Sequence, residues 1–477
     1  MKNIKEIIDQ SGIKFGTSGA RGLVIDFTQE VCTAFTVSFL DAMKKSFEFK
    51  KVAVAMDNRP SSPDMAASIC GSIESLGFQV DFYGVLPTPA LALQAMNDNI
   101  PSIMITGSHI PFDRNGIKFY TPDGEISKDD ERDILNNTNP MINVNSNLPQ
   151  AKNIACDTYL NRYKSYFGEQ CLNGLKVGIY EHSSAGRDLY VELFTSLGAE
   201  VICLGRSDDF VPIDTEAVAD IDKQRAKDWS KKYGFDAIFT TDGDGDRPLI
   251  ADENGEWLRG DIVGLLTAQH LGIEALAVPV SCNTAIEKGA FFKEVVRTRI
   301  GSPYVIEAFD ALKSYKSFAG FEANGGFLLG SVLENNGNKL DALPTRDALL
   351  PFIVLASFIA KEKISLSKLM DKLPQRFTSS DRIQDFPKAN SLKLIENGLV
   401  NSSEMLKSFG LKESKVVEID RTDGLRLTLD NGIIIHLRPS GNAPELRCYV
   451  ETDNQQYANQ LVEQVLSKIK NNQKQEN

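Results

Sequence analysis

The 477-residue chain carries 52 Lys and Arg against 64 Asp and Glu, which gives a net charge of −12. This balance excludes the basic surface that general nucleic-acid or membrane-surface binding requires, although a cleft can still be locally basic. Hydrophobic residues make up 42% of the sequence, as is ordinary for a globular protein. No run approaches the ~18 apolar residues of a membrane span. We expect neither a nucleic-acid nor a membrane partner.

The first residues and the cysteines indicate a cellular compartment. Residues 1–10 contain charges where a signal peptide needs an apolar stretch. The seven cysteines are scattered and no two have C-x-x-C spacing, which is typical of free thiols in a reducing environment. We therefore expect a cytoplasmic protein.

Three times along the chain, an apolar strand, a helix and a second strand follow one another with short connections. Such units form parallel strand pairs and predict α/β domains with a threefold repeat of architecture. Strand, helix and strand are expected at 50–57, 63–77 and 78–84, again at 175–181, 186–198 and 199–205, and again at 275–281, 284–292 and 294–301.

The C-terminal part has a different pattern. Residues 415–440 contain two alternating strands joined through Asp430-Asn431-Gly432, which is a hairpin signal. A further strand at 447–452 and a helix at 454–470 complete an antiparallel α+β module. We place domains at 1–150, 151–255, 256–370 and 371–477.

An acidic motif follows the apolar strand residues 237–239. Asp242, Asp244 and Asp246 occupy every second position and would repel one another unless a cation joined them. Oxygen ligands in this number suit Mg²⁺, and the following Arg247 can hold a phosphate or brace the loop. The alternatives are a calcium loop or an acidic surface turn, but apolar strand residues interrupt the EF-hand pattern after Pro248.

A serine loop follows the apolar run 102–105. Ser108 lies beside His109 and can be a nucleophile or a phosphate carrier, although such a dipeptide is also ordinary turn chemistry. The G-x-S-x-G pattern of many hydrolases is absent. Lys118 can serve as a general base if desolvation lowers its pKa.

Three glycine-containing loops carry groups that can bind a phosphosugar, and each is also compatible with a plain turn. Residues 320–326 offer a carboxylate and an amide for vicinal hydroxyls. Residues 438–447 offer an arginine fork, a hydroxyl and an amide for a phosphate dianion. Residues 14–22 offer a serine and Arg21 for an anion.

Taken together and in chain order, the five segments resemble the α-D-phosphohexomutase superfamily, which includes phosphomannomutases and phosphoglucomutases. The resemblance covers nearly the whole chain. It implies four domains around a central cleft, three similar α/β units with mixed sheets and a C-terminal antiparallel α+β domain. It also implies an isomerase that needs Mg²⁺, uses hexose 1,6-bisphosphate as intermediate and activator, acts on a phosphorylated hexose and works as a monomer or homodimer.

The resemblance assigns roles to individual positions. Ser108 becomes the phosphoserine, and one of its phosphate oxygens would share a Mg²⁺ ion with Asp242, Asp244 and Asp246. The groups expected to handle the proton and the transferring phosphoryl are Arg21, His109, Lys118 and Arg247. The groups expected to bind substrate are Thr17, Ser18, Glu322, Asn324, Arg438, Ser440, Gly441 and Asn442.

Several positions depart from the common family pattern. Gly107 replaces an alanine, Ile110 replaces an asparagine, and Asn324 replaces a serine. Gly326 and Ser302 stand where some members have histidines, so Lys118 is the preferred base. The sugar loop looks most similar to that of bacterial phosphomannomutases.

The reaction implied is the interconversion of mannose 6-phosphate and mannose 1-phosphate. Mannose and glucose differ only at C2, and no residue identifies C2 unambiguously. A phosphoglucomutase or a dual enzyme therefore stays open. The more remote alternatives are a phosphoglucosamine mutase, a phosphosugar phosphatase and a non-catalytic phosphosugar-binding protein.

Overall fold

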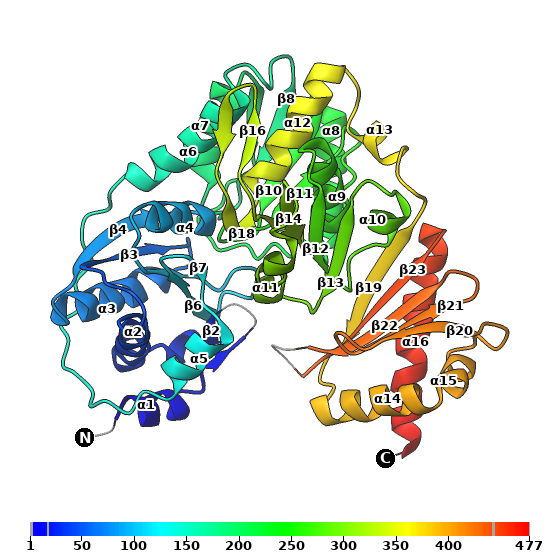
Figure 1. Cartoon of the computed structure of the whole chain (residues 1–477), viewed down its shortest axis with the longest axis horizontal. Helices are drawn as coiled ribbons and strands as arrows, with labels where there is room; N and C mark the ends of the chain where they lie inside the picture. Colours follow the sequence, from blue (N-terminus) through cyan, green and yellow to red (C-terminus); the bar gives the residue numbers. More distant parts are fainter. Residues whose placement is uncertain (1–2, 17–18, 441–443, 477) are drawn as a thin grey trace.

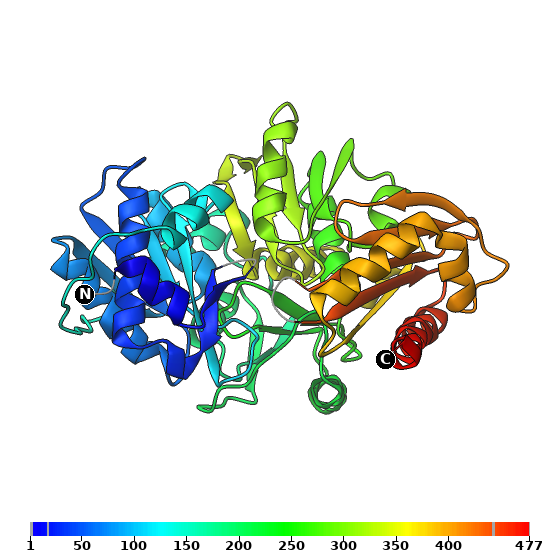
Figure 2. The same cartoon turned by 90° about the horizontal axis from the view of Figure 1, so that it is seen from below.

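The computed structural model describes residues 3–16, 19–440 and 444–476, and four units follow one another along the chain (Figure 1). The first unit lies at one end of the molecule and the fourth at the other, and a view from below shows the same order (Figure 2). Among the described residues, no helix is both long enough and apolar enough to cross a membrane.

The first unit is a seven-stranded mixed sheet with helices on both faces. Alternate residues of its interior strand β3 (Lys51–Met56) pack into two different cores, Val52 and Val54 into one and Ala53 and Ala55 into the other. Its strands are β1 (Lys14–Phe15), β2 (Ala20–Leu23), β3 (Lys51–Met56), β4 (Gln79–Val85), β5 (Ser102–Ile105), β6 (Arg114–Thr121) and β7 (Gly124–Glu125). Its helices are α1 (Ile4–Gln10), α2 (Gln29–Met43), α3 (Ser62–Ser75), α4 (Thr88–Asn97) and α5 (Lys128–Leu135).

The second and third units repeat this plan with smaller sheets. The second contains α6 (Ile154–Phe167), β8 (Lys176–Tyr180), α7 (Arg187–Ser196), β9 (Glu200–Leu204), α8 (Asp220–Tyr233), β10 (Ala237–Thr241) and β11 (Pro248–Ala251). The third contains α9 (Gly260–His270), β12 (Ala275–Pro279), α10 (Ala285–Lys288), β13 (Glu294–Thr298), α11 (Ser302–Leu312), β14 (Phe318–Phe321), β15 (Phe327–Leu329), β16 (Leu333–Asn335), β17 (Asn338–Leu340), β18 (Leu343–Asp347), α12 (Leu349–Glu362) and α13 (Ser367–Met370).

The three units share one four-strand core. The strand orders β4-β3-β5-β6, β9-β8-β10-β11 and β13-β12-β14-β15 are equivalent, with the first three strands parallel and the last antiparallel. In each unit the turn from the third strand into the antiparallel fourth carries a motif: residues 106–113, 242–247 and 322–326. The expected threefold α/β repeat is confirmed, and it places three motif loops at equivalent strand ends, where sites in α/β folds gather.

The fourth unit is a five-stranded antiparallel sheet packed against helices, as expected. It contains β19 (Phe377–Ile383), α14 (Lys388–Val400), α15 (Ser402–Ser408), β20 (Val416–Asp420), β21 (Leu425–Leu429), β22 (Ile434–Pro439), β23 (Leu446–Thr452) and α16 (Gln455–Glu476). The expectation of two strands within 415–440 is wrong, because a second turn at Asp423-Gly424 divides the segment into three. Gly424 has a φ of +88°, which glycine adopts without strain.

The apolar cores show how firmly the units are joined. One core runs from α4 through the second and third units, and the rings of Phe239 and Phe352 lie 4.8 Å apart within it. The fourth unit has a core of its own.

The helix expected at 284–292 is only one turn long, α10, because the chain leaves the helix at Gly289.

Candidate active site

The three acidic residues of the metal motif lie close together and are fully buried. Asp242, Asp244 and Asp246 each place a carboxylate oxygen within 4.8 Å of the others. The Oδ1 atoms of Asp244 and Asp246 are buried without any hydrogen-bond partner. Buried carboxylate oxygens without a donor are costly, and oxygen ligands are those that Mg²⁺ prefers. The residues present therefore fit a divalent cation.

Ser108 reaches this cluster from the first unit. Its Oγ donates to Asp242 Oδ2 at 2.6 Å, and its side chain is completely buried. Burial and the neighbouring Asp244 and Asp246 carboxylates raise the pKa of Asp242 well above its usual range. A phosphate ester on Ser108 would lie beside the acidic cluster.

Lys118 also points into the cluster from β6. Its Nζ donates to Asp244 Oδ2 and to Asp246 Oδ2, each at 2.6 Å. Burial by itself lowers the pKa of Lys118, but the two carboxylates raise it above its ordinary value. The condition that we set for a base, a lowered pKa, is therefore not met in this arrangement. The attraction of two buried carboxylates outweighs desolvation here.

Helix α4 of the first unit supports the second residue of the acidic motif. Thr88, the first residue of that helix, donates its side-chain hydroxyl to Asp244 Oδ2 at 2.7 Å and its backbone N–H to Asp244 O at 2.9 Å. A helix N-terminus favours a carboxylate. Burial raises the pKa of Asp244, but Lys118 and the Thr88 hydroxyl lower it below its usual value.

His109 and Arg247 connect Ser108 to an open cavity. Arg247 Nη1 lies 2.9 Å from His109 Nδ1, and Ser108 Oγ lies 3.4 Å from the same nitrogen. Arginine can only donate, so Nδ1 is an acceptor and the imidazole is neutral. Burial, Arg247 and Arg21 together lower the pKa of His109 well below its usual value. His109 therefore does not take the Ser108 proton in this arrangement, because that proton points to Asp242.

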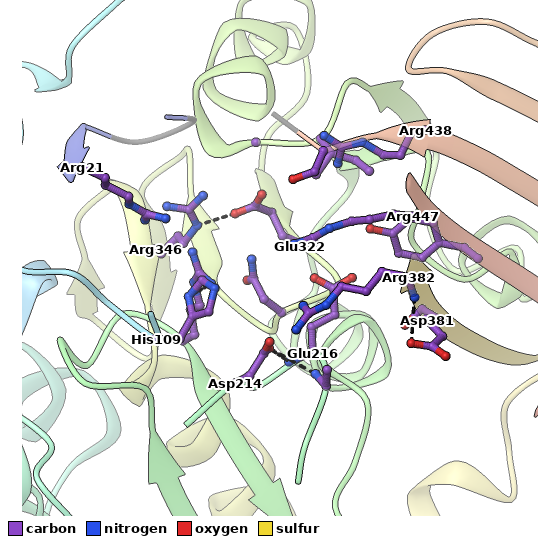
Figure 3. Close-up of a pocket in the computed structure, with 18 residues that line it drawn as sticks. Arg21, His109, Asp214, Glu216, Glu322, Arg346, Asp381, Arg382, Arg438 and Arg447 are labelled. Atoms are coloured by element: carbon purple, nitrogen blue, oxygen red, sulfur yellow. Dashed lines mark hydrogen bonds and ion pairs between the residues drawn. The ribbon is translucent and has the colours of Figure 1, made fainter. Parts of the chain in front are cut away.

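All four units line the cavity, whose volume is about 220 Å³ (Figure 3). Its described lining includes six arginines and four carboxylates, which makes it locally basic on an acidic chain. Burial and the nearby Arg247 lower the pKa of Arg21 to about 10, so its guanidinium stays charged at neutral pH. The arginines are Arg21, Arg247, Arg346, Arg382, Arg438 and Arg447, and the carboxylates are Asp214, Glu216, Glu322 and Asp381.

The sugar-loop residues Glu322 and Asn324 line this cavity, and hydrogen bonds from neighbouring residues hold them. Arg346 of β18 donates its Nε to Glu322 Oε2 (Figure 3). Burial alone raises the pKa of Glu322, but Arg346 lowers it below its usual value. Thr215 donates to the backbone O of Asn324 at 2.8 Å. The Gly326 N–H donates to Asn324 Oδ1 at 3.0 Å, so hydrogen bonds hold both side chains.

The C-terminal loop is described only in part. Arg438 of β22 and Ser440 line the cavity, opposite the first unit. The Ser440 N–H donates to Glu445 O at 2.8 Å, which closes the base of the loop. Gly441 and Asn442, and Thr17 and Ser18 of the first loop, lie outside the described residues.

The structure thus groups the expected residues in two layers. Ser108, Lys118 and the three aspartates form a buried layer, and Arg21, His109, Arg247, Glu322, Asn324, Arg438 and Ser440 line the cavity above it. The sequence reasoning missed four groups that belong to the site: Thr88, Glu216, Arg346 and Arg382. Arg447 lies within the C-terminal motif 438–447, but no role was assigned to it. No motif marks Arg346, and only the pairing of β18 with β15 brings it to the sugar loop.

The other three histidines lie outside the described cavity lining and contact backbone carbonyls or an aromatic ring. His182 Nε2 lies 2.9 Å from Thr241 O, directly before the acidic loop, and burial lowers its pKa to about 4. The ring of His270 stacks on Phe358. His436 Nε2 lies 2.6 Å from Asp423 O, and burial lowers its pKa to about 4.

Family models match all four units. They are described as the α/β/α domains I, II and III and the C-terminal domain of phosphoglucomutase/phosphomannomutase, and they match residues 12–142, 157–255, 259–377 and 376–468.

Curated relatives and a solved structure match over nearly the full length. A phosphomannomutase of Salmonella muenchen is 56% identical over 98% of this chain and 99% of the relative, and one of Sinorhizobium fredii is 41% identical over 96% and 98%. A phosphoglucomutase/phosphomannomutase family protein of Burkholderia thailandensis has the same fold, with a TM-score of 0.73 at 18% identity over 98% of both chains. The chain belongs to the phosphoglucomutase/phosphomannomutase family.

Proposed function

We propose that this chain is a phosphomannomutase, an isomerase that interconverts mannose 6-phosphate and mannose 1-phosphate through a phosphoserine at position 108. The observation that carries the proposal is the contact between Ser108 Oγ and Asp242 Oδ2, 2.6 Å, beneath a basic cavity. The names of the relatives at 56% and 41% identity support mannose phosphate as the substrate.

The proposed reaction has two phosphoryl transfers. A free hydroxyl of the hexose monophosphate attacks the phosphorus of phospho-Ser108, the P–Oγ bond breaks, and the hydroxyl proton passes to a base. The hexose bisphosphate then turns in the cavity, and Ser108 Oγ attacks its other phosphorus. The bond between that phosphorus and the sugar oxygen breaks, and the base returns the proton to that oxygen. This second transfer restores the phosphoserine and releases the isomeric monophosphate. Positioning and charge neutralisation supply most of the rate enhancement in such transfers.

The chain's residues divide these tasks. Arg21, His109 and Arg247 would surround the transferring phosphoryl. Glu322 and Asn324 would bind two sugar hydroxyls in either orientation, because the Glu322 carboxylate accepts from any hydroxyl and the Asn324 amide can accept or donate. Arg438, Ser440, Gly441 and Asn442, with Thr17 and Ser18, would hold the phosphate that does not react.

Asp242, Asp244 and Asp246 would hold Mg²⁺, which supplies positive charge to the phosphoryl oxygens. Lys118 remains the proposed base because it lies beside this cluster. Its ammonium must first leave Asp244 and Asp246, and a cation bound to those carboxylates would displace it.

Three further expectations stay proposals. Hexose 1,6-bisphosphate would load Ser108 and so act as activator. The protein would work in the cytoplasm, which the seven free cysteines support. It would be a monomer or homodimer, which light scattering during size-exclusion chromatography measures.

A coupled assay tests the reaction. The protein is incubated with Mg²⁺, hexose 1,6-bisphosphate and either mannose 1-phosphate or glucose 1-phosphate, and the 6-phosphate product is measured. We expect turnover of mannose 1-phosphate, and phosphate on Ser108 by mass spectrometry. Release of inorganic phosphate without isomer would support a phosphatase instead, and a protein that neither turns over nor carries phosphate would be a binding protein.

A further inference from the structure

We propose that Arg59 is a positioning residue that fixes the backbone of Ser108 for phosphoryl transfer, and that Phe210 of the second unit holds Arg59 in place. The inference rests on the proposed role of Ser108. Arg59 lies between β3 and α3 and is 1% exposed, and none of the motifs identified in the sequence contains it.

All five N–H groups of the Arg59 guanidinium donate hydrogen bonds, four to backbone carbonyls and one to a carboxylate. Nη2 donates to Ser108 O at 2.9 Å and to Ile110 O at 2.6 Å, and Nη1 donates to Pro111 O at 2.7 Å and to Arg114 O at 2.9 Å. Nε donates to Asp57 Oδ2 at 3.2 Å. Three carbonyls of the serine loop and that of Arg114, the first residue of β6, thus converge on one planar group. The three donors of a lysine cannot reproduce this geometry.

Asp57, the partner of Arg59, holds the other side of Ser108. Asp57 Oδ2 accepts from the Thr106 hydroxyl at 2.7 Å, and Thr106 Oγ1 accepts from the Ser108 N–H at 2.7 Å. The N–H and the C=O of Ser108 are therefore both fixed by the Asp57–Arg59 pair. Neither residue contacts the cavity, so the pair acts through the backbone alone.

The backbone of Ser108 needs such support. Its φ is +54°, in the left-handed region that residues other than glycine rarely adopt. A residue in this region persists only where its surroundings determine the conformation. The same conformation directs Oγ toward Asp242, so the fixed backbone also fixes the line along which phosphoryl transfer would occur.

The neighbouring glycine admits the guanidinium. A Cβ on Gly107 would lie 2.6 Å from Arg59 Cζ and 2.8 Å from Nε. No φ in the left-handed region requires glycine at this position, so the close approach of Arg59 accounts for the residue.

The second unit closes over Arg59. The Phe210 ring lies 3.9 Å from the guanidinium carbon, in cation–π contact. A Cβ on Gly243 would meet Ser108 O at 2.8 Å and the Phe210 ring at 2.9 Å. Phe210, the acidic loop and the serine loop thus pack against one another. This packing fixes the position of Ser108 relative to the three aspartates.

The test measures phosphate loading of Ser108 from hexose 1,6-bisphosphate by intact-mass spectrometry, together with kcat and KM for mannose 1-phosphate. We expect Arg59→Lys to lower the loading rate and kcat by about 100-fold, the effect of a small misplacement of a reacting group. KM should stay within about twofold, because the substrate contacts lie elsewhere. Added guanidinium should partly restore Arg59→Ala, whose side-chain site is vacated, and not Arg59→Lys.

Two further variants keep the test informative if the Arg59 variants do not fold. Phe210→Leu keeps the apolar cover but removes the cation–π contact, and Gly107→Ala displaces the guanidinium; each should lower kcat about tenfold. The matched control is Arg297→Lys, because Arg297 also donates to backbone carbonyls, Pro279 O at 2.9 Å and Cys282 O at 2.8 Å, in the third unit. Its kcat should equal that of the wild type.

The two levels of the proposal fail differently. If the wild type acquires no phosphate at Ser108, the proposed function is wrong. If the wild type is loaded, and the folded Arg59→Lys, Phe210→Leu and Gly107→Ala proteins are loaded at the same rate, the positioning role of Arg59 is wrong. If Arg297→Lys loses as much kcat as Arg59→Lys, the positioning role is also contradicted.

Discussion

Ser108 and Asp242 are 134 residues apart in the sequence, and the Ser108 hydroxyl donates to Asp242 Oδ2 at 2.6 Å. The two residues lie on equivalent turns of two repeated units, each between the third parallel strand and the antiparallel fourth. The repeat therefore places a phosphorylatable hydroxyl of one unit against the carboxylates of the next.

Replacing the phosphate carrier should remove turnover and leave the fold intact. In Ser108→Ala the hydrogen bond to Asp242 is lost, which costs about 1 kcal/mol of unfolding free energy. Mutase activity should fall to background in the coupled assay, while urea denaturation shows a folded protein. Full activity in the variant would show that another residue carries the phosphoryl.

Removing Lys118 should strengthen cation binding while it impairs catalysis. Its ammonium occupies Oδ2 of Asp244 and of Asp246, so it competes with any cation for the same oxygens. We expect Lys118→Met to bind Mg²⁺ roughly tenfold more tightly by calorimetry and to lose most of its turnover. Weaker Mg²⁺ binding in the variant would mean that Lys118 supports the metal site.

Arg346→Met should destabilise the protein in a pH-dependent way. The variant leaves buried Glu322 without its cation, which costs about 3–5 kcal/mol at pH 7. Arg346 lowers the pKa of Glu322 in the folded state, so the folded protein binds fewer protons than the unfolded chain near pH 4, and this stabilisation is lost as the pH falls through the folded pKa. Urea denaturation at pH 7 and pH 4 should therefore show a smaller difference from the wild type at pH 4.

A suitable control for Arg346→Met is Lys313→Met, whose ion pair with Asp310 is exposed to solvent. Exposed pairs add little to stability, so this variant should match the wild type at both pH values. A difference for Arg346→Met that is larger at pH 4 than at pH 7 would contradict the assigned ion pair.

Gly245→Ala should distort the acidic loop. Gly245 has a φ of +71°, and a Cβ there would lie 2.6 Å from the Tyr190 hydroxyl and 3.0 Å from Pro87 Cβ. The left-handed conformation alone costs alanine about 1–2 kcal/mol. We expect weaker Mg²⁺ binding and a lower thermal midpoint. Gly234→Ala is the matched control, because its φ is +65° and no atom lies within 4 Å of the added Cβ; equal losses in both variants would assign the effect to backbone strain alone.

The sequence was sufficient to predict the repeated strands and the position of the motifs at their ends. Apolar runs such as 51–56 are long and continuous because both faces are buried, so their strand character is local information. The division of 415–440 into three strands was missed, although Asp423-Gly424 is itself a turn signal. The segment contains two turn signals, at 423–424 and at 430–432, and therefore forms three strands.

The unpredicted parts of the site depend on contacts between distant segments. Arg346 reaches Glu322 only because β18 pairs with β15, and Thr88 reaches Asp244 only because α4 packs against the second unit. The state of Lys118 depends on which of two opposing effects is larger, desolvation or the attraction of two carboxylates. No pattern in the local sequence determines that balance.

We propose that Asp242, Asp244 and Asp246 hold a divalent ion against a phosphate ester on Ser108. A crystal structure of the protein loaded from hexose 1,6-bisphosphate in the presence of Mn²⁺, with anomalous scattering used to locate the metal, tests this arrangement directly. We expect one metal peak coordinated by the three carboxylates and by an oxygen of phospho-Ser108, with Lys118 displaced from them. Phosphate on Ser108 with the metal bound elsewhere, or with Lys118 still between Asp244 and Asp246, would contradict it.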